Sequence, residues 1–201
     1  VGERSCPCST WNDTATPTTA ASSDAQAVEL GVKFKSDLNG YITGIRFYKG
    51  SGNTGTHIGN LWTSAGQLLT TATFSNETAS GWQQVNFSQP VAINANTVYV
   101  ASYHTSSGRY AINEGYFTSS IDSPPLHFLR DGESGGNGVY KYGTTGFPTN
   151  TYRASNYWVD VTFATSATDT TPPSISATSP SNGATNVSTA TSITATFSEA
   201  I

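Results

Sequence analysis

Short runs in which apolar and polar residues alternate recur along the chain, and this pattern limits the possible folds more than any other feature. The first run, 28–34, places Val28, Leu30, Val32 and Phe34 on one face. A period of two is that of a β-strand with one buried face. No window shows the 3.6-residue period and capping residues of a helix. The sequence therefore predicts an all-β protein.

The same pattern predicts further strands, separated by turns rich in Gly, Ser and Asn. They lie at residues 42–48, 58–63, 68–74, 82–87, 98–103, 110–113, 127–129, 139–142 and 157–163. About ten short strands at this spacing are typical of sandwiches and barrels. We expect residues 28–163 to form an antiparallel two-sheet β-sandwich of the jelly-roll type.

Composition excludes two classes of function and favours a third. The 201 residues include 31 Thr, 26 Ser and 19 Gly, and the net charge is -4. Without a basic face there is nothing to neutralise phosphates, so nucleic-acid binding is not expected. No apolar run approaches the ~20 residues of a membrane helix, so no membrane span is expected. A hydroxyl-rich chain of this kind is typical of secreted or cell-surface proteins, and a start without Met fits a processed or internal N-terminus.

The ends of the chain differ from its middle. Residues 1–27 are small and polar and predict an extended N-terminal arm, with Trp11 as its one large apolar side chain. Residues 164–173 read as a Thr/Pro linker. Residues 174–201 hold only two strand-like pieces, far fewer than an Ig-like sandwich contains. This last segment is predicted to be partly Ig-like, either the truncated start of a longer protein or strands that dock elsewhere.

The cysteines are Cys6 and Cys8, with Pro7 between them. A bridge between such close neighbours is geometrically awkward. Three states remain open: a strained local disulfide, bonds to another chain, or two free thiols. The secreted composition favours the first two.

Three motifs lie within the predicted strands: Gly44-Ile45-Arg46-Phe47-Tyr48-Lys49, Gly81-Trp82-Gln83-Gln84-Val85 and Asn156-Tyr157-Trp158-Val159-Asp160-Val161. With these motifs, about residues 28–163 resemble a bacterial family, the domain of unknown function 4082. Thr171-Pro172-Pro173, together with Ser192–Ala200, is similar to the opening of a bacterial Ig-like module. The resemblance implies a secreted multidomain protein. The family has no established activity, so no functional residue is carried over.

No catalytic or metal-binding motif emerges. The histidines are expected to satisfy turn hydrogen bonds, since a Ser/His/Asp set exists on paper in any serine-rich chain. No cluster of ligands predicts a metal site or cofactor. Structural calcium in the loop Asp131–Glu133 remains possible but lacks the ligand spacing of known loops. The sequence predicts a protein that is not an enzyme.

Two binding functions remain. In the first, terminal segments add strands to neighbouring copies and build a head-to-tail extracellular fibre or surface array. The apolar residues predicted to be donated are Ile175, Ile193, Phe197 and Ile201. In the alternative, the domain is a carbohydrate-binding or adhesion module of a larger secreted protein, with polysaccharide as its partner. The rings available for stacking are Trp62, Trp82, Tyr103, Tyr110, Tyr140, Tyr142 and Trp158. Of these, Trp62, Trp82 and Trp158 are predicted to bind the sugar, although sandwich aromatics are more often core residues.

Glycosylation is a further possibility. The sequence has N-glycosylation triplets at Asn12, Asn76, Asn86 and Asn186. The threonine-rich stretch near the N-terminus offers O-glycosylation candidates, Thr16, Thr18 and Thr19. Asn86 alternates with Val85 and Phe87 and is therefore expected to face solvent.

Overall fold

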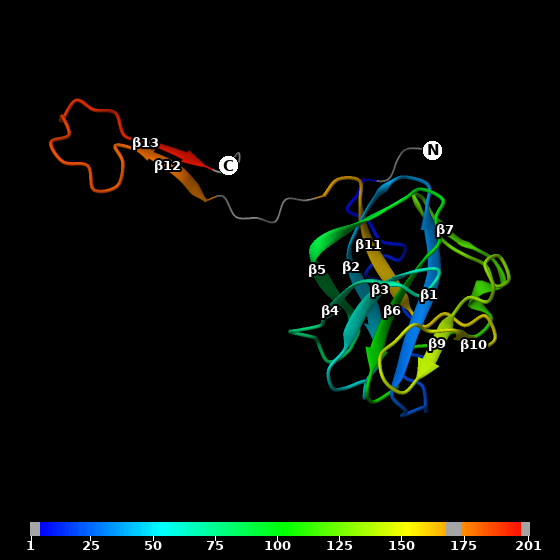
Figure 1. Cartoon of the computed structure of the whole chain (residues 1–201). Helices are drawn as coiled ribbons and strands as arrows, with labels where there is room; N and C mark the ends of the chain where they lie inside the picture. The colour runs from blue at the N-terminus through cyan, green and yellow to red at the C-terminus, as the bar shows by residue number, and fades with distance from the viewer. Residues whose placement is uncertain (1–4, 168–173, 198–201) are drawn as a thin grey trace. The chain divides into compact units, whose positions relative to one another are not determined.

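The computed structural model describes residues 5–167 and 174–197 and shows an almost entirely β chain (Figure 1). The chain divides into two compact units, Val1–Thr168 and Asp169–Ile201. The first unit holds every strand up to β11, and the second holds a single hairpin. No helix in the described ranges is long and apolar enough to cross a membrane.

The larger sheet of the first unit is antiparallel and runs β10-β9-β1-β6-β3-β4, with β8 also paired to β1 and β7 paired to β8. Its strands are β1 (Val28–Ser36), β3 (Ile58–Thr63), β4 (Leu68–Thr73), β6 (Tyr99–Thr105), β7 (Ile121–Ser123), β8 (Leu126–Phe128), β9 (Val139–Tyr142) and β10 (Asn150–Thr151). Strand β1 lies inside the sheet because one edge pairs with β6, while the other edge pairs with β9 along its first half and with β8 along its second half.

The smaller antiparallel sheet runs β11-β2-β5 and consists of β2 (Gly40–Lys49), β5 (Gly81–Ile93) and β11 (Val159–Ala164). Apolar residues from both sheets meet in one buried core, to which β1 contributes Leu30 and Phe34 and β11 contributes Val161 and Phe163. Fully burying a side chain of this size contributes roughly 1.5–3 kcal/mol. The all-β sandwich predicted from the alternation is confirmed, and the jelly-roll connectivity stays a prediction.

Most predicted strands are present, but one predicted strand is absent and three short elements were not predicted. Residues 110–113 form no strand; Ile112 and Asn113 make isolated bridges instead. A short 3-10 helix, η1 (Tyr116–Thr118), and the short strands β7 and β10 were not predicted. Elements of two or three residues are too short to show a period.

The N-terminal segment, residues 5–27, packs against the sandwich, where the sequence predicts an extended arm outside it. Trp11 is only 8% exposed. Its ring lies 5.5 Å from that of Trp158 and 6.1 Å from that of Trp82. The backbone N–H groups of Thr10 and Trp11 donate to the buried carboxylate of Asp160. A polar segment with one large apolar residue can dock because the domain supplies both an aromatic cluster and a buried acceptor.

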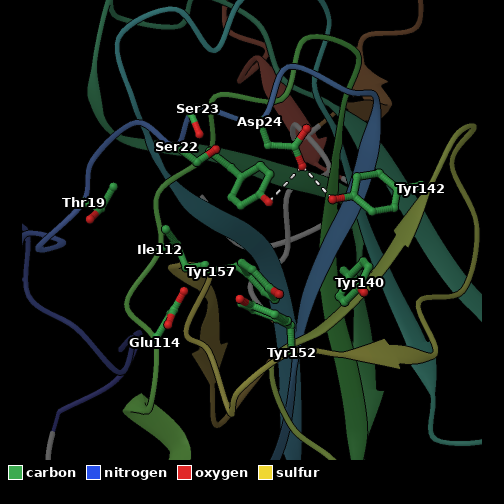
Figure 2. Close-up of a pocket in the computed structure, with 11 residues that line it drawn as sticks. Thr19, Ser22, Ser23, Asp24, Ile112, Glu114, Tyr140, Tyr142, Tyr152 and Tyr157 are labelled. Carbon is green, nitrogen blue, oxygen red and sulfur yellow. Dashed lines mark hydrogen bonds between the residues drawn. The ribbon is translucent and has the colours of Figure 1, made fainter.

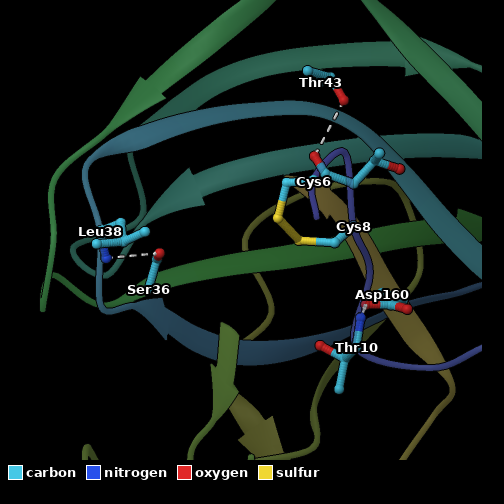
Figure 3. The surroundings of a disulfide bond; sticks show 8 residues. Cys6, Cys8, Thr10, Ser36, Leu38, Thr43 and Asp160 are labelled. Carbon is cyan, nitrogen blue, oxygen red and sulfur yellow. Dashed lines mark hydrogen bonds between the residues drawn. A yellow bond between two sulfur atoms is a disulfide. The ribbon is translucent and has the colours of Figure 1, made fainter. Parts of the chain in front are cut away.

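Cys6 and Cys8 form a disulfide bond with each other, which is the first of the three states left open by the sequence (Figure 3). Cys8 is buried, and its backbone exchanges two hydrogen bonds with that of Phe163 in β11. The bridge therefore lies where the N-terminal segment joins the smaller sheet.

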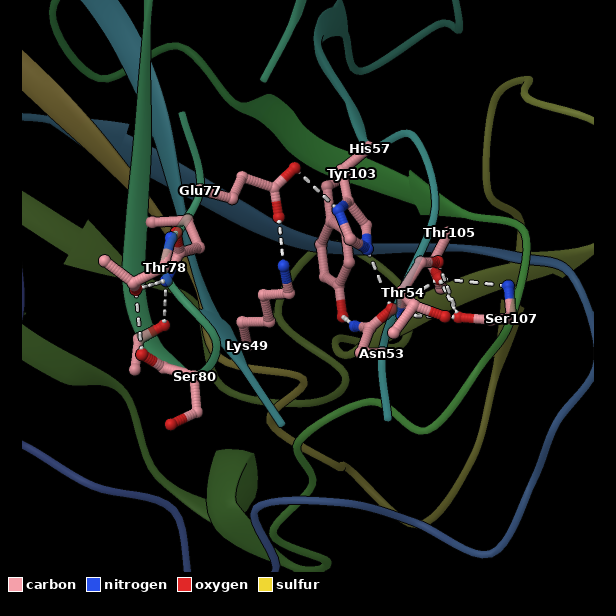
Figure 4. A network of polar contacts seen from close by, with 12 residues as sticks. Lys49, Asn53, Thr54, His57, Glu77, Thr78, Ser80, Tyr103, Thr105 and Ser107 are labelled. Carbon is pink, nitrogen blue, oxygen red and sulfur yellow. Dashed lines mark hydrogen bonds and ion pairs between the residues drawn. The ribbon is translucent and has the colours of Figure 1, made fainter. Parts of the chain in front are cut away.

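Two buried polar networks further fix the sandwich. In the first (Figure 4), His57 lies between Glu77, which also pairs with Lys49, and Asn53. Burial lowers the pKa of His57, although the hydrogen bond with Glu77 opposes this. The second centres on Glu29, which alternation assigns to the solvent face of β1 but which is 0% exposed. Its carboxylate accepts hydrogen bonds from four groups, Asn60 Nδ2, Ser102 Oγ, Thr145 Oγ1 and Gly146 N–H.

The second unit contains an antiparallel hairpin of β12 (Ile175–Ser179) and β13 (Thr194–Phe197). Ile175, Ile193 and Phe197 are 60%, 87% and 40% exposed. Ile201, the fourth residue predicted to be donated to a neighbour, lies outside the described residues, as do positions 168–173 of the predicted linker.

Candidate functional site: a tyrosine-lined pocket

Five tyrosines and two carboxylates line an open cavity of about 510 Å³ on the first unit (Figure 2). We call this cavity the tyrosine pocket. Its tyrosines are Tyr110, Tyr140, Tyr142, Tyr152 and Tyr157, its carboxylates are Asp24 and Glu114, and its remaining lining residues are Thr19, Ser22, Ser23 and Ile112. The volume is within the range of roughly 300–1,000 Å³ that is usual for small-molecule sites.

Strand β9 supplies two of the rings. Tyr140 and Tyr142 are two residues apart, so both side chains project from the same face of the strand. Their ring centroids are 5.5 Å apart in an edge-to-face arrangement. Because these rings stand on a strand of the larger sheet, their positions are set by the core of the fold.

The loop between β10 and β11 supplies Tyr152 and Tyr157, and a glycine holds it against β9. Gly138, next to the start of β9, has a φ of +72°, and a Cβ atom there would lie 1.8 Å from the carbonyl oxygen of Ser155. Only glycine combines a positive φ with this close approach at low cost. The edge-to-face pair of Tyr157 and Tyr110, with centroids 5.7 Å apart, extends the aromatic wall to the loop after β6.

The N-terminal segment forms the opposite wall through backbone hydrogen bonds to the loop after β6. Ser22 N–H donates to Tyr110 O, Ile112 N–H donates to Thr19 O, and Arg109 N–H donates to Asp24 O. This pairing brings Asp24 to the edge of the pocket. The site therefore requires the docked N-terminal segment.

Asp24 is the polar centre of the pocket. Its Oδ2 atom accepts hydrogen bonds from the hydroxyls of Tyr142, at 2.7 Å, and Tyr110, at 3.1 Å, and its Oδ1 atom accepts one from Gln26 N–H. Burial by itself raises the pKa of Asp24, but these three hydrogen bonds and the charge of Arg109 together outweigh burial and hold the pKa below its usual value. Burial raises the pKa of Tyr110, and the neighbouring Asp24 raises it further. At neutral pH the pocket thus holds an ionised carboxylate between two tyrosine hydroxyl donors.

At the pocket rim, Glu114 pairs with Arg153, whose Nη1 lies 2.7 Å from Glu114 Oε2. The same guanidinium lies 5.0 Å from the ring centroid of Tyr152. Tyr142 and Tyr152 are 44% and 43% exposed. Both side chains are therefore partly accessible from solvent, and Arg153 covers one face of the Tyr152 ring.

The tryptophans predicted to bind sugar do not form an exposed surface. Trp62 and Trp158 are 7% and 3% exposed. Trp62 donates to Ser102 Oγ and packs in a small cluster with Val100 and Val139. Trp82 is half-buried and donates to Ala15 O, and its ring lies 6.0 Å from that of Trp158. The structure places Trp82 and Trp158 in the cluster that holds the N-terminal segment, so these rings have a packing role.

The other predicted site residues are dispersed over the chain. All candidate modification sites are exposed, and Thr19 also lines the tyrosine pocket: Asn12, Asn76, Asn86, Asn186, Thr16, Thr18 and Thr19. In the loop suggested for calcium, Asp131 accepts a hydrogen bond from Asn137 N–H and Glu133 pairs with Lys35. Among the described residues, no group of three or more His, Cys, Asp or Glu side chains is arranged to hold a metal ion.

A second, smaller cavity of about 230 Å³ has His127 in its lining. The ring nitrogens of His127 lie 2.6 Å from carboxylate oxygens of Asp37 and Asp122. Burial by itself lowers the pKa of His127, but the two aspartates outweigh burial and raise it. His127 therefore links the β1–β2 turn to strands β7 and β8 through its contacts with Asp37 and Asp122.

The sequence analysis counted Tyr110, Tyr140 and Tyr142 among the rings available for stacking, but it did not predict that they form one pocket with Tyr152, Tyr157 and two carboxylates. The alternation Tyr140-x-Tyr142 on a predicted strand was a visible signal for two of its rings. Asp24, Glu114 and Tyr152 lie on segments without a period, so only the folded chain brings them together.

Comparison with known proteins identifies two regions. Residues 14–159 match the model of a domain of unknown function (DUF4082). Residues 169–201 match that of a bacterial Ig-like domain. No curated protein matches the chain significantly. The Ig-like match is compatible with a bacterial surface or extracellular module.

Proposed function

The chain belongs to the family of the domain of unknown function 4082, and we propose that it is a non-catalytic, carbohydrate-binding module of a secreted or cell-surface bacterial protein. The observation that carries the proposal is the tyrosine pocket, in which five tyrosines and two carboxylates line one open cavity. The proposed carbohydrate site therefore consists of tyrosines and not of the tryptophans that the sequence predicted.

The chemistry of the pocket suits a sugar in two respects. Sugar rings present apolar C–H faces that stack on aromatic rings, and Tyr142 and Tyr152 expose such rings. Sugar hydroxyls need both donors and acceptors close to those rings. Asp24 and Glu114 offer acceptors, and tyrosine and serine hydroxyls offer both. An apolar wall with a few convergent polar groups is the usual composition of a small-molecule site.

The chain's hydrogen-bonding pattern supports a binding role over catalysis. The His57 ring is held between Glu77 and Asn53, His127 between two aspartates, and His104 Nε2 bonds to Gly143 O. None of these contacts pairs a histidine with a serine nucleophile among the described residues. The rings are used to join loops and strands.

The test is a glycan array probed with the full chain and with Tyr142→Ala and Tyr152→Ala. We expect each variant to bind the glycan on the order of tenfold more weakly, because one stacking ring contributes about 1.4 kcal/mol, which corresponds to a factor of ten in affinity. Tyr41→Ala, at a half-buried tyrosine outside the pocket, is the matched control. Binding by the wild type that survives in both pocket variants would refute the assignment, and so would the absence of any bound glycan.

A second candidate function is assembly into a fibre or surface array with neighbouring copies. The observation that favours it is the exposure of Ile175, Ile193 and Phe197 on the C-terminal hairpin. The N-terminal segment no longer supports strand donation, because it is docked on its own domain. Electron microscopy of natively secreted material tests this function: ordered filaments that disperse on deletion of residues 174–201 support it, and single particles refute it.

A further inference from the structure

We propose that the tyrosine pocket selects a sugar carrying a free ammonium group, that is, a de-N-acetylated amino sugar, over its N-acetylated or acidic counterparts. This inference rests on the proposed function and specifies its ligand class. It follows from the charge and the aromatic content of the pocket walls taken together.

The walls of the tyrosine pocket carry carboxylate charge. The charged residues that line the pocket are Asp24 and Glu114, and within the described part of the chain no Lys or Arg lines it. Two guanidinium groups lie nearby. Arg153 pairs with Glu114 and offsets its charge, whereas Arg109 Nη1 donates to Ser23 O and keeps a positive charge that acts on Asp24. Asp24 is therefore the carboxylate that would attract an ammonium group and repel an acidic sugar.

Asp24 is the specific partner for the ammonium group. A carboxylate offers about four acceptor sites. The hydroxyls of Tyr142 and Tyr110 occupy two sites on Oδ2, and Gln26 N–H occupies one on Oδ1. One acceptor site therefore remains for a charge-assisted hydrogen bond, which is roughly twice as strong as a neutral one.

The aromatic rings of the pocket also favour a cation, independently of Asp24. A cation near the face of a tyrosine gains about 0.5–1 kcal/mol at an exposed site and more when it is desolvated. The structure already shows this contact at the pocket rim, where the Arg153 guanidinium lies 5.0 Å from the centroid of Tyr152. Tyr140 continues the wall, with its ring centroid 5.5 Å from that of Tyr142 and 6.3 Å from that of Tyr157. An ammonium group beside Asp24 would thus be close to several electron-rich rings.

The experiment compares two probes of equal length by calorimetry on the full chain, a glucosamine tetramer and an N-acetylglucosamine tetramer. At about pH 5 the sugar amines are protonated, although the neighbouring ring and hydroxyl oxygens make them weaker bases than a free α-amino group, while Asp24 stays ionised because its pKa is held below the usual value. We expect the glucosamine tetramer to bind at least about tenfold more tightly. Asp24→Asn should remove this preference by weakening the binding of the glucosamine tetramer at least about tenfold.

Two further variants keep the test decisive. Glu114→Gln removes a pocket carboxylate without touching the tyrosine hydrogen bonds of Asp24, so it reports on charge if Asp24→Asn folds poorly. Glu133→Gln removes an exposed carboxylate that does not line the tyrosine pocket, and it should bind like the wild type. A uniform loss in all three variants would mean that only the overall charge matters, which overturns the inference.

The remaining outcomes separate the inference from the proposed function. Equal affinity for both tetramers, or binding of only neutral or acidic glycans through the tyrosines, overturns the amino-sugar selectivity and leaves the carbohydrate-binding function standing. Failure of every glycan to bind overturns both.

Discussion

Replacing Trp11 by alanine tests whether the N-terminal segment is an integral part of the fold. Trp11 is 8% exposed and contacts the rings of Trp82, Trp158 and Phe128. A buried tryptophan removes roughly 150–250 Å² from water, which at about 25 cal/mol per Å² corresponds to roughly 4–6 kcal/mol as an upper bound. Measured Trp→Ala changes in cores cost about 3–5 kcal/mol.

We therefore expect Trp11→Ala to lower the free energy of unfolding by about 4 kcal/mol and the melting temperature by about 12 °C. Urea unfolding followed by far-UV circular dichroism measures the change, because it does not depend on tryptophan fluorescence. Leu38→Ala, at an exposed apolar side chain of the same unit, is the control and should cost less than about 1 kcal/mol.

A loss below about 1 kcal/mol in Trp11→Ala would refute the reasoning, since a side chain this buried cannot be removed so cheaply from a docked segment. The segment would then be the free arm that the sequence suggested. Donation of a strand by the N-terminal segment to a neighbouring copy would then again be a tenable hypothesis.

Three further predictions concern the rest of the first unit. Because the pKa of His127 is raised, its contribution to stability is complete below the ordinary histidine value of 6.5 and is lost as pH rises through the folded-state pKa. Urea unfolding at about pH 6 and about pH 9 should show this loss of stability, and His127→Gln should abolish it. The same pH dependence in His127→Gln as in the wild type would contradict the role given to His127. Glu29→Gln places an amide N–H₂ opposite either Asn60 Nδ2 or Gly146 N–H, which can only donate, and should cost about 2 kcal/mol of unfolding free energy by the same method; an unaltered denaturation midpoint would contradict the buried network. Gly138→Ala forces a Cβ into the carbonyl of Ser155 and should both destabilise the protein by more than about 1 kcal/mol and weaken glycan binding; wild-type behaviour in both assays would rule out this contact.

The sequence carried enough information for the strands with a buried face. The alternation over 28–34 and the run 139–142 correspond to β1 and β9 because period-two burial is a local property. The same rule failed at Glu29, which alternation assigns to solvent. The loop that contains Thr145 folds over it, and a single strand's pattern cannot report what covers its outer face.

The binding site could be anticipated only in part. The sequence analysis predicted three tryptophans as sugar-stacking rings, yet Trp82 and Trp158 pack against Trp11 of the docked N-terminal segment. The tyrosine pocket depends on contacts between residues far apart in sequence, such as the hydrogen bond from Tyr142 to Asp24. Neither residue type nor spacing reveals such a pair before the chain is folded.

The central claim is that the tyrosine pocket binds a carbohydrate. Half of the chain's 10 tyrosines line the pocket and half do not, so ring resonances of tyrosine-labelled protein distinguish the two sets directly. Titration with a glycan that binds should shift the ring signals of Tyr110, Tyr140, Tyr142, Tyr152 and Tyr157 and leave those of Tyr41, Tyr48 and Tyr99 in place. Shifts confined to tyrosines outside the pocket, or no shift at saturating glycan, would contradict the claim.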